Sequence, residues 1–239
     1  MNKKDEVIPG EKWEFDNNVT EAFDDMLERS IPGFTDMRKL ATSLACEFAI
    51  DDTSIIDLGC SRGGSLVPII EKVGARNYYI GLEISAPMRE AAISRFSNFS
   101  EIKVEIRNTD LRHEFPNESS SVVLSILTLQ FVPIEYRQQI LSKAFNSLVK
   151  GGAFILVEKI LGRDSELNDM FVKLYYDTKG ENGYTEEQIN TKRRALEGVL
   201  VPVTSDWNEQ LLSNAGFKHV ECFWRSLNFA GWVGIKVDN

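Results

Sequence analysis

A glycine-rich segment is the part of this sequence whose residue types are best suited to hold a ligand. Residues 57–64 read DLGCSRGG, after the apolar run SIIDL (54–58) and before the helical pattern of residues 65–73. Gly59 accepts backbone angles that other residues resist, so a ligand can approach the main chain closely. Gly63 lets the start of the helix lie tight beneath that ligand. A strand, a glycine-rich turn and a helix in this order predict a nucleotide-type binding loop.

Two acids stand where the next strands are predicted to end. Glu83 closes the strand at 77–83, 24 residues after Gly59, and a carboxylate there can accept both ribose hydroxyls of an adenosine. Asp110 follows the strand at 101–106 and is expected at the adenine edge. A ligand that contains adenosine is therefore predicted.

The order of residues within the loop separates two adenosine cofactors. Dinucleotide enzymes usually show G-x-G-x-x-G, which residues 59–64 lack. Asp57, the acid before the first glycine, is more typical of S-adenosylmethionine sites, where the ligand brings an amino group and no pyrophosphate. The sequence favours S-adenosylmethionine, and the turn of an unrelated α/β protein is the remaining alternative.

Strands and helices must alternate to bring these residues to one edge of a sheet. Apolar runs predict strands at 54–58, 77–83, 101–106, 121–127 and 153–159. Helical patterns lie at 19–29, 35–48, 65–73, 85–96 and 134–148, the last stopped by the glycines at 151–152. This alternation predicts an α/β fold with a Rossmann-like, doubly wound and mostly parallel sheet covered by helices on both faces.

The two ends of the chain depart from this alternation. Residues 1–12 are polar and are expected to form a flexible tail. The polar helical pattern at 163–195 predicts an insertion, and the runs at 219–226 and 228–237 predict an antiparallel hairpin. Because no linker or repeat interrupts them, residues 13–239 are expected to form a single domain.

Composition limits the classes of function. The 239 residues suffice for one large domain, and the net charge of −9 disfavours direct binding of nucleic acid or of an anionic membrane. Three cysteines (Cys46, Cys60 and Cys222) and two histidines give too few soft ligands for a structural zinc site, so no metal is expected. Free thiols suit a reducing compartment, and the N-terminus lacks the apolar core of a signal peptide. We therefore expect a cytoplasmic enzyme with a small-molecule substrate.

Further motifs give the chain a specific resemblance. It resembles the carboxy-S-adenosylmethionine synthase family, formerly described as a tRNA uridine-5-oxyacetate methyltransferase, in DLGCS (57–61), TLQF (128–131), VEK (157–159), NGY (182–184) followed by KR (192–193), and AGF (215–217). W-x-F-D (13–16), RSIPGF (29–34) and LNF (227–229) are similar to that family too. The similarity covers nearly the whole chain, from Trp13 to Val237.

This resemblance implies a class I methyltransferase-like fold, a homodimer and an unusual reaction. Prephenate would lose carbon dioxide, which the methyl carbon of S-adenosylmethionine captures, giving carboxy-S-adenosylmethionine and phenylpyruvate. The product would feed modification of the tRNA wobble uridine. By the same resemblance the cofactor, as S-adenosylmethionine, its carboxylated form or S-adenosylhomocysteine, would be lined by Gly59, Cys60 and Ser61, with Glu83 and Ile84 at the ribose and Asp110 and Leu111 at the adenine.

The resemblance also gives Arg193 a catalytic role, pairing with the new carboxylate from across the dimer. The chemistry supports such a partner, because the sulfonium makes the methyl group acidic and the product carries a carboxylate that must be balanced inside a pocket. An arginine fork holds two carboxylate oxygens at once. Taken alone, an arginine in INTKRRALEG is more typical of a solvated helix face.

At three positions the chain differs from the family pattern. Phe34 replaces a tyrosine, Ile126 replaces an asparagine, and Glu83-Ile84 replaces an Asp-Asn pair. Phe34 and Ile126 are still expected beside the cofactor, but without the hydroxyl and the amide. They leave open a second hypothesis, a methyltransferase that acts on a small molecule or a nucleoside. A non-catalytic binding module is the third.

Two sets of residues keep alternative interpretations. Glu158 ends the fifth predicted strand and is either a base or a residue that supports the fold. Tyr175, Tyr176 and Tyr184 lie in the polar insertion, where they form either a lid over the substrate or the packing of helices or a dimer surface.

Overall fold

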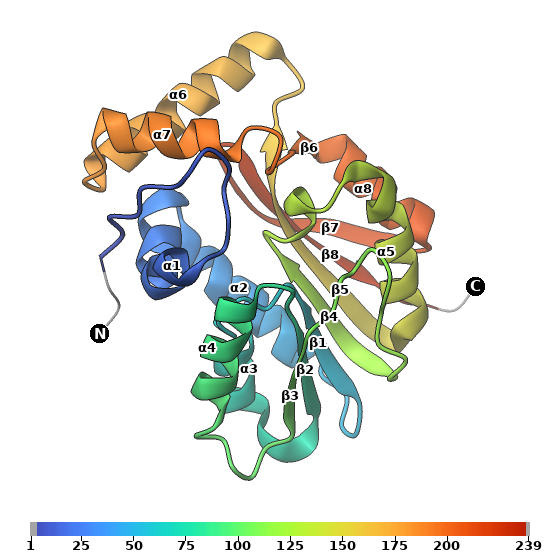
Figure 1. Cartoon of the computed structure of the whole chain (residues 1–239). Helices are drawn as coiled ribbons and strands as arrows, with labels where there is room; N and C mark the ends of the chain where they lie inside the picture. The colour runs from blue at the N-terminus through green and yellow to red at the C-terminus, as the bar shows by residue number, and fades with distance from the viewer. Residues whose placement is uncertain (1–3, 238–239) are drawn as a thin grey trace.

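The computed structural model describes residues 4–237, which are built around a twisted sheet (Figure 1). Its strand order is β3-β2-β1-β4-β5-β8-β7, and β6 pairs with the end of β5. Pairing is parallel from β3 across to β5, and antiparallel where β8 joins β5 and β7 joins β8. The strands are β1 (Ser54–Leu58), β2 (Tyr78–Leu82), β3 (Val104–Arg107), β4 (Ser120–Ile126), β5 (Leu148–Leu161), β6 (Val203–Thr204), β7 (His219–Ser226) and β8 (Phe229–Ile235).

The strand order follows from right-handed crossovers between parallel strands. The chain runs outward from β1 to β2 and β3, and then returns past β1 to β4 and β5. The reversal between β1 and β4 creates the switch point at which open α/β sheets bind ligands, beyond the carboxyl ends of their strands. The doubly wound, mostly parallel sheet and the C-terminal hairpin that the sequence predicted are both confirmed.

Helices cover both faces of the sheet. The helices α2, α3 and α4 contribute Met37, Leu66 and Phe96 to the core on one face, and α5 and α8 contribute Leu141 and Leu212 to the core on the other. The α-helices are α1 (Asn17–Ser30), α2 (Phe34–Glu47), α3 (Leu66–Val73), α4 (Ala86–Phe96), α5 (Ile134–Ser147), α6 (Ser165–Glu181), α7 (Glu186–Leu196) and α8 (Ser205–Ala215). None of the helices within residues 4–237 is long and apolar enough to cross a membrane.

Local sequence fixes where several helices begin. Asp16 accepts the Val19 amide at the start of α1, Ser85 caps α4, and Thr185 forms a capping box with Gln188 at the start of α7. The helix predicted at 35–48 begins one residue earlier, because Gly33 adopts φ +73° and takes the cap position instead of Thr35.

The N-terminal segment packs more closely than the sequence suggested. Residues 1–12 were predicted to form a flexible tail, of which residues 1–3 lie outside the described part. From Lys4 onward the chain runs beside α1 and α7 (Figure 1), and the Asp5 side chain is buried. Trp13 donates its amide to the Ala195 carbonyl at 2.9 Å and packs in a small core with Met26. We call residues 4–12 the N-terminal arm.

Candidate active site

A cavity of about 500 Å³ lies beside the carboxyl ends of β1, β2 and β4. Nine of the twelve residues that the sequence assigned to the site line this cavity: Phe34, Gly59, Cys60, Ser61, Glu83, Ile84, Asp110, Leu111 and Ile126. The other three, Asp57, Gly63 and Arg193, do not. The volume falls in the range of small-molecule sites.

The glycine loop leaves no space for side chains at two of its positions. Gly59 has φ +69°, and a Cβ atom added there would lie 2.5 Å from Thr128 Cγ2. Gly63 has φ +76° and lies directly against the ring of Phe96, so it supports the loop from behind rather than from within the cavity. Ser61 also takes a left-handed conformation, with φ +49°, although it carries a side chain. Such strain is typical of backbone held in place for a ligand.

Glu83 is anchored by the loop and exposed to the cavity. Its Oε2 accepts the Ser61 amide at 2.9 Å, and its Oε1 accepts the Ser85 amide at 2.7 Å. Burial raises the pKa of Glu83, and these two amides partly offset that rise by stabilising the charged form. Each carboxylate oxygen can accept a further hydrogen bond, so the side chain remains free to accept a pair of ligand hydroxyls.

Asp57 lies behind the loop instead of lining the cavity. The residue is 2% exposed and its Oδ2 has no hydrogen-bond partner among the described residues. Burial, followed by repulsion from Glu83, raises the pKa of Asp57 to about 8, so the carboxyl is neutral at pH 7. The sequence predicted a ligand contact here, and the structure places the side chain beneath the site.

This raised pKa has a measurable consequence for stability. Because the pKa of Asp57 lies near 4 in the unfolded chain and at about 8 in the fold, the folded state holds the proton more tightly. The contribution of this proton to the free energy of unfolding is complete below about pH 4 and is lost as pH rises through about 8. Between pH 5.5 and 8.5, we expect urea unfolding to show a smaller loss of stability for Asp57→Asn than for the native protein. Parallel curves for the two proteins would contradict this assignment.

On the adenine side of the predicted site, Asp110 is fixed by hydrogen bonds from Arg112. Asp110 accepts the Arg112 amide at 3.0 Å and two guanidinium nitrogens of the same residue, with Nη2 at 2.6 Å. The hydrogen bonds from Arg112 lower the pKa of the Asp110 carboxyl. Leu111 is buried beside it, whereas Ile84 is 59% exposed at the rim.

One wall of the cavity is apolar, although the Arg38 guanidinium, 5.3 Å from the centre of the Phe34 ring, also lines the cavity. Phe34 and Ile126 line this wall, and Leu127 follows with φ +60°, a strained conformation for a branched side chain. Cys60 also lines the cavity, but burial raises the pKa of its thiol, so it is no nucleophile. Within residues 4–237 no group of three or more His, Cys, Asp or Glu side chains is arranged to hold a metal ion.

Three lysines that the sequence analysis missed line the same cavity. They are Lys159, Lys179 and Lys192. Lys159 follows Glu158 at the end of an apolar strand. Two adjacent charged residues at the end of such a strand could have identified Lys159 as a candidate site residue. Lys179 and Lys192 belong to polar helices whose pattern does not distinguish a buried lysine from a solvated one. They are 6% and 3% exposed.

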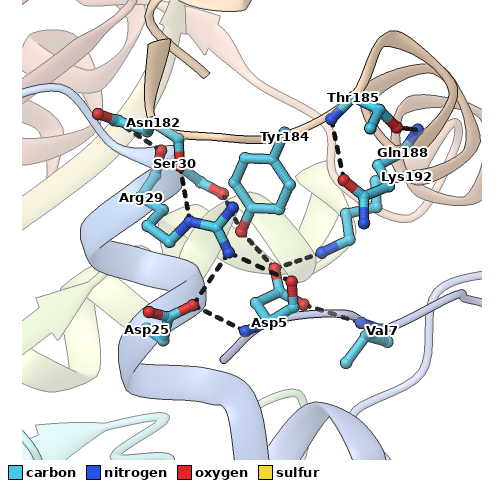
Figure 2. Close-up of polar contacts among 10 residues, drawn as sticks. All are labelled: Asp5, Val7, Asp25, Arg29, Ser30, Asn182, Tyr184, Thr185, Gln188 and Lys192. Carbon is cyan, nitrogen blue, oxygen red and sulfur yellow. Dashed lines mark hydrogen bonds and ion pairs between the residues drawn. The ribbon is translucent and has the colours of Figure 1, made fainter. Parts of the chain in front are cut away.

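Lys192 is neutralised by the N-terminal arm (Figure 2). Its ammonium donates to Asp5 Oδ2, which also accepts the Tyr184 hydroxyl. Arg29 stacks over the Tyr184 ring at 4.1 Å from its centre and donates to Asp25 at 3.2 Å. The arm, α1 and α7 are thus joined beside the cavity by one network, whose centre at Asp5 and Lys192 is buried.

Two predicted functional residues lie outside the cavity of this chain. The Arg193 side chain is 45% exposed on α7, and its Nη1 pairs with Glu197 Oε1 at 2.9 Å. Glu158 is buried, accepts the Leu129 amide at 3.0 Å, and has its pKa raised to about 8 by burial. Of the two interpretations of Glu158, the structure favours support of the fold.

Tyr175 lines the cavity while packing against Phe229.

The residues present fit an adenosyl sulfonium nucleoside. Gly59 lines the cavity with its main chain, and Thr128 packs where its Cβ atom would be, so no side chain of Gly59 stands between the backbone and a ligand. The carboxylate of Glu83 suits a ribose diol, and the apolar wall suits a thioether or a methyl group. Fold and site together define a class I S-adenosylmethionine-dependent methyltransferase architecture.

Comparisons with known proteins agree with this class. The family model described as "Methyltransferase domain" matches residues 55–152. Among solved structures, an O-methyltransferase family protein from Burkholderia thailandensis is 18% identical with a TM-score of 0.63, covering 93% of this chain and 60% of that chain. Human N-acetylserotonin methyltransferase in complex with SAM is 14% identical with a TM-score of 0.61, covering 93% of this chain and 56% of that one. These likenesses show the fold.

Curated relatives identify the family. The carboxy-S-adenosyl-L-methionine synthase of Methylococcus capsulatus is 38% identical over 224 residues, which are 93% of this chain and 93% of the relative. That of Campylobacter lari is 36% identical over 237 residues, 98% of this chain and all of the relative. The chain belongs to the carboxy-S-adenosyl-L-methionine synthase family.

Proposed function

We propose that this chain binds S-adenosylmethionine and carboxylates it, with prephenate as the source of the carboxyl group. The observation that carries the proposal is Glu83, a carboxylate fixed by two backbone amides and open to the cavity beside the Gly59 turn. Glu83 accepts the ribose hydroxyls, and the backbone at Cys60 and Ser61 holds the amino-acid end. When bound, the cofactor supplies a methyl carbon made acidic by the adjacent sulfonium.

The proposed reaction balances without a further reactant. The bond between the prephenate ring and its carboxylate breaks, and its electron pair enters the ring as the ring hydroxyl leaves. That hydroxide and one methyl proton depart as water. The carboxyl carbon bonds to the methyl carbon, and the products are carboxy-S-adenosylmethionine, phenylpyruvate and water.

The apolar wall supports this chemistry. The side chains of Phe34 and Ile126 carry no hydrogen-bond donor, so a carboxylate packed directly against them, away from the Arg38 guanidinium that lines the same cavity, is poorly solvated. Poor solvation raises the energy of the carboxylate and favours its departure as carbon dioxide.

The same two residues motivate a second candidate, a methyltransferase acting on a small molecule or a nucleoside. A hydroxyl and an amide of the family pattern are absent at Phe34 and Ile126, so the second substrate differs under this hypothesis. It predicts formation of S-adenosylhomocysteine with an acceptor and indifference to prephenate.

The distinguishing experiment is the mass of the product. The purified protein is incubated with S-adenosylmethionine and prephenate, the nucleosides are separated by chromatography, and their masses are measured by mass spectrometry. A carboxylated cofactor together with phenylpyruvate supports the proposal. If calorimetry shows that the cofactor binds while neither product forms, carboxyl transfer from prephenate is rejected.

A homodimer completes the proposed enzyme, which acts in the cytoplasm and feeds tRNA wobble uridine modification without contacting nucleic acid. Arg193 reaches into the partner's cavity and pairs with the new carboxylate. An exposed apolar stripe on α6 supports a second copy as the occupant of this face, since Leu167, Met170 and Leu174 are 48, 52 and 42% exposed at helical spacing.

We expect Met170→Glu to convert the dimer to a monomer, because a charge placed in an apolar interface must be desolvated without a partner. Carboxylation should fall at least about tenfold as Arg193 loses its position, the loss that follows from one charge-assisted contact. Sedimentation and turnover measure the two effects. Leu40→Glu, at an apolar side chain 44% exposed on α2, is the matched control. A fully active dimer of Met170→Glu, or a monomeric native protein, would contradict the proposed interface.

A further inference from the structure

Two lysine side chains, Lys179 buried and Lys159 partly buried, face the cavity without an anion. Lys159 and Lys179 line it, and within residues 4–237 neither ammonium has a hydrogen-bond acceptor or a carboxylate in ion-pair distance. Both lie close to one aromatic ring, with Lys159 Nζ 4.7 Å and Lys179 Nζ 5.4 Å from the centre of Tyr175. An ammonium has three donors, and contact with a ring face satisfies none of them fully.

The charges of the protein leave this pair unbalanced. Asp5 is the acid that enters the lysine cluster, and its Oδ2 is already taken by Lys192 and the Tyr184 hydroxyl (Figure 2). Burial lowers the pKa of Lys159 and of Lys179 to about 8; for Lys179 the charges of Lys192 and Lys159 add to that effect, and the charge of Asp5 offsets only part of it. A bound anion would remove this cost, since an opposite charge favours the ammonium form.

Resting on the proposed function, we infer that Lys159 and Lys179 form a carboxylate subsite that anchors the donor by the carboxylate it keeps, the 2-oxo-acid end of prephenate that remains in phenylpyruvate. Tyr175 and Phe229, which pack edge to face with centres 5.6 Å apart, give the subsite an aromatic floor suited to the ring of the donor.

The identity of the anchored carboxylate follows from the chemistry. Prephenate carries two carboxylates, and the one on the ring must leave as neutral carbon dioxide. Cations that held the departing group would stabilise the substrate more than the transition state and slow the reaction. Cations that hold the retained group bind substrate and transition state alike and leave the ring carboxylate free to lie beside the apolar wall of Phe34 and Ile126.

The test uses Lys159→Met and Lys179→Met, which keep most of the side-chain length and remove the charge. We expect each to raise the KM for prephenate about tenfold or more, the loss typical of one charge-assisted hydrogen bond, with kcat changed far less. Inhibition by phenylpyruvate should weaken to the same degree, and calorimetric affinity for S-adenosylmethionine should stay unchanged. Lys72→Met, at an exposed lysine in the last turn of α3, is the matched control.

Thermal unfolding separates this role from a structural one. Removal of a charge that is poorly exposed to water and has no partner should leave the melting temperature of Lys159→Met and Lys179→Met equal or higher, whereas loss of a structural contact would lower it. The methyl ester of phenylpyruvate, which lacks the anchored charge, should bind the native protein and both variants equally.

The outcomes for the subsite and for the reaction are distinct. If the native protein makes carboxy-S-adenosylmethionine while both variants keep the native KM for prephenate, the subsite is overturned and the reaction stands. If the native protein makes none but phenylpyruvate binding still depends on the lysines, the proposed reaction falls and the anion subsite remains. Loss of affinity for the carboxylated cofactor alone, with phenylpyruvate binding intact, would assign the lysines to the product and overturn the inference.

Discussion

Replacing Glu83 with alanine should raise the dissociation constant for S-adenosylmethionine by about 100-fold or more. The side chain is expected to accept two ribose hydroxyls, and hydrogen bonds to a charged group contribute about 1.5–3 kcal/mol each. Since 1.4 kcal/mol is a factor of ten, two such bonds exceed a factor of 100. The substitution also leaves the Ser61 and Ser85 amides without acceptors, so the loop loses its support. Calorimetric titration with the nucleoside measures the loss.

Two further variants make this experiment decisive. Glu83→Gln keeps one acceptor oxygen and the approximate shape, so it should fall between alanine and the native protein. Glu90→Ala removes an exposed acid from α4 and should bind the cofactor normally. If Glu83→Ala binds the nucleoside with native affinity, the cofactor lies elsewhere and the proposed function loses its basis.

The fold could be predicted because its determinants are local and periodic. Apolar runs such as residues 121–127 are long enough for one buried strand, and the crossovers between them have a fixed hand. The errors fall where local signals compete with tertiary contacts. The glycines at 151–152 were predicted to stop a helix, but α5 already ends at Ser147, and Gly151 lies with φ +81° inside the long strand β5. The pairing register of β5 with β4 shifts between Leu148 and Ala153, so Gly151 lies in a β-bulge, where its positive φ is accommodated without ending the strand.

The site was predictable where its residues follow strand ends, and not where its residues come from distant helices. Gly59, Glu83 and Asp110 line one cavity because parallel strands place their carboxyl ends side by side. The lysines of α6 and α7 could not be found in this way, because the depth of a lysine on a polar helix depends on what packs against that helix. The same is true of Asp5, which lies in a polar stretch and becomes buried only when the arm meets Tyr184 and Lys192.

Asp5→Ala provides the sharpest test of the N-terminal arm. The ion pair between Asp5 and Lys192 is almost fully buried, with side chains 0 and 4% exposed. Removal of Asp5 leaves the Lys192 ammonium buried without a counter-charge. Breaking a buried pair in this way costs about 3 kcal/mol or more. For a chain of this length the melting temperature should fall by roughly 6–12 °C. Differential scanning calorimetry of the ligand-free protein measures the shift.

A double variant distinguishes a stranded charge from a merely loosened arm. If the cost arises from the unpaired ammonium of Lys192, then Lys192→Met introduced together with Asp5→Ala should recover most of the lost stability, because removing both partners of a buried pair is often nearly neutral. If the arm contributes mainly through packing, the double variant should be no more stable than Asp5→Ala alone. The comparison matters for the cavity as well. Lys192, which has a carboxylate partner, should respond in the opposite direction to Lys179, which has none, although both lysines line the same space.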